Sequence, residues 1–305
     1  MAGYVLRRSL QAAFSIVGVL ILAFVLARSA GDPVYLLLPP TASEAEVVSL
    51  RQALGLDRPI GVQLLVYMAN VVRGDWGESL YFREPVFEVI LSRVPATLEL
   101  TFTAFAVALL VAIPLGILAA VRRNGFLDFA ATVLAVSGQA LPLFWVGLVL
   151  IVVFAVNIPL FPVSGRGTVL HLVLPSVTLG IYLSAHIMRL TRSEMLNTLS
   201  QDYIRTAHAK GVRNGRVIGV HALKNALTPV ISAIGLSFGR TLGGTVITET
   251  VFSWPGLGRL VVDAVRSYDY PLIQGCVVIL AVFIVVANLL SDLGVAALDP
   301  RIRYS

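Results

Sequence analysis

Long apolar runs separated by short polar intervals dominate the pattern of hydrophobic and polar positions along this chain. A helix needs about 20 residues to cross the hydrocarbon core of a bilayer. Six runs qualify, at residues 9–28, 97–121, 129–157, 172–190, 228–249 and 271–294. Because a helix satisfies its own backbone hydrogen bonds in lipid, the pattern predicts an all-α, polytopic membrane protein with six transmembrane helices.

Positive charge near the ends of these runs predicts their orientation. The interval 191–227 carries six Lys or Arg against two acids, whereas 30–96 carries five Arg against eight acids. If the chain begins in the cytoplasm and crosses the membrane six times, Arg7, Arg122 and Arg301 also lie on the same side as 191–227. We therefore expect 191–227 and both termini in the cytoplasm, and 30–96 outside.

Three parts follow from this pattern: an N-terminal transmembrane helix (1–29), an extracytoplasmic segment (30–96) and a core of five transmembrane helices (97–305). The first run resembles a secretory signal, but it exceeds the usual length of about 7–15 apolar residues, which favours an uncleaved anchor. In the external segment, Ser43 and Glu46 form a capping box, and Gly55 ends that helix. A second short amphipathic helix begins near Pro59 and ends at Gly74.

Composition agrees with a membrane protein. Hydrophobic residues make up 57% of the 305 residues and charged residues 13%, where a soluble protein has about 25%. The net charge is +6, but the basic residues lie at the ends of apolar runs, which indicates topology rather than nucleic-acid binding. One cysteine, Cys276, allows no internal disulfide, and the four histidines lack the spacing of a metal site. We expect no metal, no cofactor and no catalytic residue.

Gly235, Gly239 and Gly243 recur every four residues in the fifth span. Such a stripe lets a neighbouring helix approach closely, and we predict a packing role. Residues 235–239 also match the G-x-S-x-G pattern of a serine hydrolase, with Ser237 as nucleophile and His221 as the nearest candidate base. An intramembrane serine protease is therefore one alternative function.

Arg240 lies in the same span, where a charge costs about 2.5–3.5 kcal/mol on insertion scales. It must face the interior of the bundle or water, and Glu249 or Glu99 are candidate partners. Either a place on a transport pathway or a structural ion pair explains it. These three residues also leave open a secondary transporter driven by ions.

The interval 191–227 contains two predicted short helices, about Gln201–Lys210 and Asn214–Ala226, separated at Gly211. Glycine ends a helix with a positive φ at no steric cost. Pro229 fits the first turn of the next membrane helix. Binding to anionic lipid explains the basic charge, but Ala207, Ala209 and Gly211 form a low ridge that suits a protein groove better. The chain lacks a G-x-x-x-x-G-K-[ST] phosphate loop, so any ATP must be hydrolysed by another protein.

Residues 202–211, DYIRTAHAKG, resemble the EAA loop of ATP-binding-cassette (ABC) importer permeases, in the variant of the dipeptide/oligopeptide/nickel family. Arg205 stands where the general pattern has Glu. Other segments similar to this family are 74–79, 95–100, 249–258, 269–271 and 298–301. The loop residues that carry the resemblance are Asp202, Tyr203, Arg205, Thr206, Ala207, Ala209, Lys210 and Gly211.

The resemblance implies a multi-pass permease subunit in the cell inner membrane, of the first-permease type, which imports short peptides. Nickel or glutathione are alternative substrates within the family. It implies a second homologous permease, two ATP-binding subunits and an extracytoplasmic solute-binding protein as partners, besides membrane lipid. Residues 207–211 would belong to a coupling helix seated on one ATP-binding subunit, and the chain itself would have no enzymatic activity.

Overall fold

The computed structural model describes residues 2–29, 34, 38 and 41–298 of the chain. These residues are helical or irregular and contain no strand, only an isolated bridge between Glu78 and Pro85. The chain divides into two compact units, one formed by Leu98–Trp254 with Ala287–Ser305 and one by Ala2–Thr97 with Pro255–Val286. We call the first the core unit and the second the outer unit, and each is described by itself.

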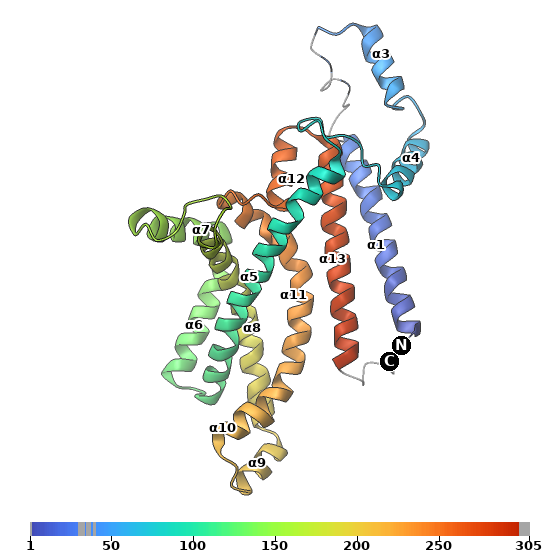
Figure 1. The fold of residues 1–305 in the computed structure, drawn as a ribbon. Helices are drawn as coiled ribbons and strands as arrows, with labels where there is room; N and C mark the ends of the chain where they lie inside the picture. Colours follow the sequence, from blue (N-terminus) through green and yellow to red (C-terminus); the bar gives the residue numbers. More distant parts are fainter. Residues whose placement is uncertain (1, 30–33, 35–37, 39–40, 299–305) are drawn as a thin grey trace. The chain divides into compact units, whose positions relative to one another are not determined.

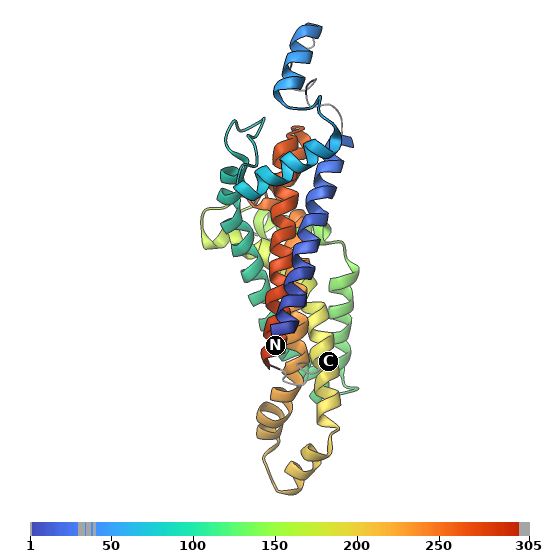
Figure 2. The ribbon, with the colours of Figure 1, turned by 90° about the vertical axis from the view of Figure 1, so that its right-hand side faces the viewer.

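The helices are drawn in Figure 1 and, turned by 90°, in Figure 2. The outer unit contains α1 (Ala2–Ser29), α3 (Glu44–Ala53), α4 (Ile60–Arg73), the start of α5 (Val86–Val121), α12 (Leu257–Arg266) and the first part of α13 (Tyr270–Leu298). The core unit contains the rest of α5, then α6 (Phe126–Ala140), α7 (Leu143–Ile151), the π-helix η1 (Val152–Asn157), α8 (Val169–Leu199), α9 (Asp202–Ala209), α10 (Asn214–Arg216), the π-helix η2 (Val217–Ala222) and α11 (Leu223–Val251).

Within the described residues, five helices are long and apolar enough to cross a membrane, and a bent helix pair brings the number to six if it counts as one span. The bent pair occupies the predicted span 129–157, which is therefore not one straight helix. α6 and α7 meet at 103°. Leu141 is extended, with ψ of 136°, because the residue before a proline avoids the helical region, and Pro142 follows it. The break separates α6 from α7 and directs the two helices differently.

The predicted separate helix Asn214–Ala226 is also corrected. α10, η2 and α11 follow one another without a gap, so Pro229 lies in the interior of α11 rather than in its first turn. A proline there removes one helical hydrogen bond. Burial compensates, because Ala222, Ala226 and Val230 are completely buried on this stretch. Tertiary packing thus keeps the chain helical at Pro229, although proline normally stands in the first turn of a helix.

The two helices predicted between the first and second spans are confirmed. Ser43 caps α3, and its N–H and hydroxyl donate to the Glu46 carboxylate at 2.7 and 2.9 Å. These bonds favour the charged form and lower the pKa of Glu46 below its ordinary value. Gly55 and Gly74 have φ of 66° and 85°, as a left-handed helix end requires.

Close approach of helices in the core unit depends on small residues. A Cβ added at Gly180 of α8 would lie 2.8 Å from Val107 Cγ1 of α5, and one at Gly116 would lie 2.7 Å from Thr191 Cβ. Gly235 of α11 makes a similar approach to Ser291 of α13, as its predicted packing role requires. Gly239 is buried, and the surroundings of Gly243 lie outside the described side chains.

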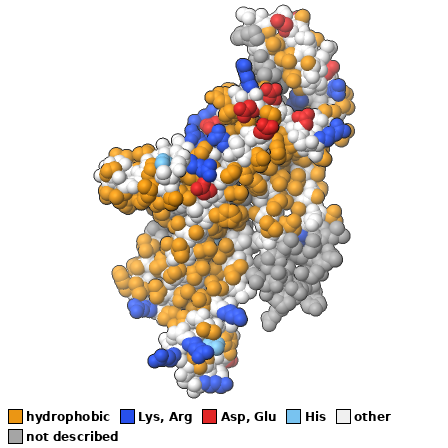
Figure 3. Space-filling model, viewed as in Figure 1, with side chains coloured by type: hydrophobic (Ala, Val, Ile, Leu, Met, Phe, Trp, Pro, Cys, Tyr) orange, Lys and Arg blue, Asp and Glu red, His pale blue; other side chains and the backbone are white. Residues whose placement is uncertain are grey.

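Hydrophobic side chains cover the sides of the helices of the core unit in Figure 3, as expected for surfaces in contact with lipid. Lys and Arg gather at the end that carries α9 and α10 (Figure 3). The turn between α5 and α6 lies toward the same end, and η1 lies toward the opposite end (Figures 1 and 2). Charge and helix direction therefore divide the core unit into a basic end and an opposite end.

Candidate functional site

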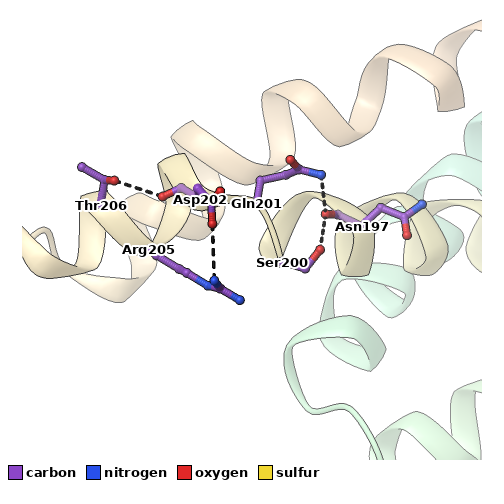
Figure 4. Close-up of polar contacts among 6 residues, drawn as sticks. All are labelled: Asn197, Ser200, Gln201, Asp202, Arg205 and Thr206. Carbon is purple, nitrogen blue, oxygen red and sulfur yellow. Dashed lines mark hydrogen bonds and ion pairs between the residues drawn. The ribbon is translucent and has the colours of Figure 1, made fainter.

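The candidate site is the segment from Asn197 to Val212, centred on α9. Figure 4 shows how polar contacts form the turn into this helix. Ser200 Oγ and Gln201 Nε2 donate to the Asn197 carbonyl at 2.8 and 3.4 Å, which satisfies the exposed end of α8. In α9 itself, Thr206 Oγ1 donates to the Asp202 carbonyl at 3.0 Å, and Arg205 pairs with the Asp202 carboxylate at 3.3 Å.

Gly211 ends α9 in the way that the sequence predicts. Its φ is 74°, and its N–H donates to the His208 carbonyl at 2.9 Å. The next residue, Val212, donates its N–H to the Ala207 carbonyl at 3.2 Å. This pair of bonds is the Schellman motif, which reverses the chain tightly after a helix. The turn therefore fixes where α9 ends and how the chain returns toward α10.

The inner face of α9 packs onto the transmembrane helices. Ile204 is 2% exposed and belongs to an apolar cluster with Ala120 of α5, Met195 of α8 and Val217 of η2. Asn225 Nδ2 of α11 donates to the Tyr203 hydroxyl at 2.9 Å and to the His221 carbonyl at 3.0 Å. These contacts attach α9 to three long helices, α5, α8 and α11.

The outer face of α9 is exposed. Asp202, Arg205, Thr206, Ala209 and Lys210 all lie in contact with solvent. The predicted ridge is only partly on this face, because Ala207 is half-buried against the same apolar cluster as Ile204. The sequence pattern did not predict that Ala207 is half-buried while Ala209 is exposed. Both side chains are small, and contacts with other helices decide which of them faces inward. The exposed ridge consists of Ala209 and Gly211.

An ion pair between α6 and α8 was not predicted from the sequence. Arg192 of α8 makes a bidentate ion pair with Asp128 of α6, with Nε–Oδ1 at 2.6 Å and Nη2–Oδ2 at 2.8 Å. The Asn124 N–H also donates to Asp128 at 3.0 Å. Asp128 is 5% exposed, and the signal that could have found it is an acid directly before a long apolar run. The pair joins the basic end of α8 to the turn between α5 and α6.

The pathway or ion pair predicted for Arg240, Glu249 and Glu99 stays a prediction. Glu99 pairs with Arg166, whose Nη2 lies 2.7 Å from Glu99 Oε2, and Arg166 also lies over the Trp254 ring at 5.8 Å. Glu249 is completely buried in α11. The side chain of Arg240 lies outside the described side chains. Arg166 was missed because it stands in a loop with no neighbouring charge in sequence.

The serine protease alternative does not fit the structure. Ser237 lies in the middle of α11 and donates to the Ala233 carbonyl at 2.8 Å, whereas His221 lies in η2 on the same helical stretch. Sixteen residues separate them, which is about 24 Å along a helix, too far for a hydrogen bond. A nucleophile elbow also needs a strand before the serine, and this serine is inside a helix.

Two of the family-like segments meet in the outer unit. Asp269, completely buried, accepts hydrogen bonds from the Ser79 hydroxyl and from the Tyr81 N–H, the latter at 3.1 Å. It also accepts from the Leu272 N–H at 3.2 Å and so caps α13. The loop 74–85 is thereby fixed to the start of α13, although the two segments lie far apart in sequence.

The sequence matches two family models along nearly its whole length. Residues 112–304 match the model described as binding-protein-dependent transport system inner membrane component. Residues 1–101 match the model for the N-terminal part of such membrane components.

Curated relatives align over their full length. The oligopeptide transport system permease protein AppB of Bacillus subtilis (strain 168) is 42% identical over 316 residues, covering 100% of both chains. The dipeptide transport system permease protein DppB of Escherichia coli (strain K12) is 40% identical, covering 100% of this chain and 99% of DppB. The glutathione transport system permease protein GsiC of Salmonella choleraesuis (strain SC-B67) is 42% identical over 305 residues, covering 100% of both.

Solved structures show the same fold at low identity. A structure of the MetNI methionine ABC transporter in an inward facing conformation aligns with a TM-score of 0.61 at 18% identity, covering 69% of this chain and 96% of that chain. An amino acid ABC transporter with histidines aligns with a TM-score of 0.51 at 19% identity, covering 70% of this chain and 94% of that chain.

Proposed function

Because the chain belongs to the binding-protein-dependent transport system inner membrane components, we propose how it works as a permease subunit of an ABC peptide importer. The exposed face of α9 docks in a groove of an ATP-binding subunit. The attached helices α8 and α11 then move with α9 when that subunit binds and hydrolyses ATP. In this arrangement the chain couples ATP hydrolysis to transport without an ATPase site of its own.

The observation that carries this proposal is the contrast between the two faces of α9. Its inner face is held by Ile204 and by the hydrogen bond between Asn225 and Tyr203, while the residues of its outer face are exposed. A lever needs both, a firm attachment to the moving part and an accessible surface for the partner. The ion pair between Asp128 and Arg192 adds α6 to the group of helices that move together.

The partners follow from the same family. We propose a second, homologous permease, two ATP-binding subunits and an extracytoplasmic solute-binding protein, assembled in the cell inner membrane. The basic end of the core unit would face the cytoplasm, since Lys and Arg accumulate on the cytoplasmic side of membrane proteins. The charge pattern of the sequence predicts residues 30–96 on the external side, and there they would face the binding protein.

Short peptides are the proposed substrate. The three relatives are named for oligopeptides, dipeptides and glutathione, and glutathione is itself a tripeptide. Glutathione is the second candidate, because its permease is 42% identical to this chain, the same identity as the oligopeptide permease. Uptake of labelled dialanine and of glutathione by the reconstituted complex with its binding protein separates the two.

Replacing Ala209 with Glu tests the docking face. The new carboxylate would be buried without a partner in the interface, so we expect the ATP-binding subunit to bind at least about tenfold more weakly, equivalent to about 1.4 kcal/mol. Co-purification of the tagged permease with the ATP-binding subunits measures this loss. Ala45→Glu is the matched control, because Ala45 is equally exposed but lies on α3 of the outer unit.

Stoichiometric co-purification of the Ala209→Glu variant would show that this face of α9 is not the docking surface. A separate result would contradict the proposed function as a whole. If peptide uptake continued without ATP and stopped when the proton gradient was removed, the chain would be a secondary transporter.

A further inference from the structure

The core unit contains a cavity of about 420 Å³ among α6, the start of α7, α8 and α11. Its apolar lining comes mainly from leucine and isoleucine side chains. Its polar lining comes from three helices brought together by the fold, α6, α8 and α11: Gln139, Tyr182, His186, Ser237 and Thr241. The volume lies within the range of about 300–1,000 Å³ that is typical of sites for small molecules.

Two of these polar groups have no hydrogen-bond partner in the part of the chain that the structure describes. Tyr182 and His186 stand one turn apart on α8, both exposed, and among the described residues neither the Tyr182 hydroxyl nor the His186 ring makes a hydrogen bond. Gln139 differs, because its side-chain oxygen accepts a hydrogen bond from Arg189, which stands one turn beyond His186. Its amide nitrogen remains available as a donor.

The two hydroxyls of α11 face the same cavity as acceptors. Ser237 donates to the Ala233 carbonyl and Thr241 to the Ser237 carbonyl, both at 2.8 Å. Each hydroxyl has used its proton in its own helix, and its lone pairs remain to accept a bond from a ligand. The cavity therefore offers donors and acceptors together, as a peptide backbone needs.

This polar surface does not suit contact with lipid. Groups without hydrogen bonds are costly in hydrocarbon, and within membrane helices they face the bundle interior or a water-filled cavity. Elsewhere on the same helices large apolar side chains are exposed, and Leu134 of α6, for example, is 66% exposed. On α6, Gln139 therefore marks a face toward a water-filled cavity, and Leu134 marks a face toward lipid.

We propose that this cavity binds the peptide as it passes through the membrane, with His186, Tyr182 and Gln139 as contact residues. This inference rests on the proposed function as a peptide importer and names the part of this chain that touches the substrate. The imidazole and the phenol contact peptide carbonyl and carboxylate oxygens, and the hydroxyls of Ser237 and Thr241 accept from peptide N–H groups. The positive charge of Arg189, which donates to Gln139, favours an acidic peptide over a basic one.

Thiol accessibility tests whether the cavity is wet and occupied. Cys276, the single native cysteine, is buried and is replaced by Ser to give a background without thiols. Gln139→Cys and Tyr182→Cys are compared with Leu134→Cys in the complete reconstituted transporter, using a charged methanethiosulfonate reagent. We expect both cavity positions to react at least about tenfold faster than Leu134→Cys, and dialanine delivered by the binding protein with ATP to slow their reaction.

A negative charge introduced at His186 tests peptide contact by selectivity, which a purely structural role would not alter. His186→Glu should raise the ratio of dilysine to diaspartate uptake about tenfold, equivalent to about 1.4 kcal/mol. The binding protein is the same for both variants, so the change in ratio reports the permease. Leu134→Glu is unsuitable as a control because it places a charge in lipid, and Leu134→Gln serves instead.

The outcomes separate this inference from the proposed function. Equal reaction rates at positions 134, 139 and 182, or an unchanged uptake ratio in His186→Glu with transport intact, would overturn the cavity as a peptide site. Absence of ATP-dependent peptide uptake by the unmodified complex would overturn the proposed function instead. Fast labelling that dialanine does not slow would show a wet cavity that the peptide does not enter, and would also overturn the inference.

Discussion

At Gly211 the chain adopts a φ of 74° in open space, since an added Cβ would meet no atom within 4 Å. Only backbone strain therefore opposes a larger residue there, and a non-glycine residue in such a region costs about 1–3 kcal/mol. We expect Gly211→Val to misplace the end of α9 and to reduce peptide uptake per ATP hydrolysed about tenfold. Paired measurements of uptake and ATP hydrolysis in proteoliposomes detect this uncoupling.

Gly215 provides the matched control for this residue. It is also surrounded by open space, but it lies in α10 with an ordinary negative φ. Gly215→Val should therefore keep the coupling ratio of the unmodified complex. Equal effects of the two substitutions would mean that the left-handed turn is not what positions α9.

Among the elements, α5 and α8 cross with no room for a side chain at Gly180. Gly180→Val would force a side chain into the space of Val107 and of the Ala104 carbonyl, which lies 3.2 Å from the added Cβ. Overpacking of this kind costs about 1–3 kcal/mol. We expect a lower Tm of the detergent-solubilised complex, measured by the loss of monodisperse protein on heating, and no comparable shift for Gly219→Val, where the added Cβ meets nothing within 4 Å.

For the whole molecule, the testable consequence is its orientation in the membrane. In the Cys276→Ser background, Glu84→Cys in the outer unit should react with an impermeant thiol reagent from the external side, and Lys210→Cys at the end of α9 only from the cytoplasmic side. Both native side chains are exposed, so burial does not limit labelling at either position. Labelling of both from one side would contradict the six-span topology that we infer from charge.

Local chemistry is what the sequence by itself determined. The apolar runs are long enough to identify the five long membrane helices, because hydrocarbon requires about 20 apolar residues whatever the neighbours are. The capping box of Ser43 and Glu46 and the turn at Gly211 follow from hydrogen bonds and φ angles within a few residues. The motif in residues 202–211 pointed to the family for the same reason, since it is a continuous segment.

Contacts between distant segments were decided only by the tertiary structure. Both Pro142 and Pro229 lie within apolar runs, yet the helix breaks at Pro142 and continues through Pro229. Burial of Ala222 and Ala226 keeps the second stretch helical. Membrane helices are apolar on nearly all sides, so the sequence does not show which face meets a neighbour. For that reason the pairs Asp128–Arg192 and Glu99–Arg166, and the polar cavity at His186, appear only when the helices are packed.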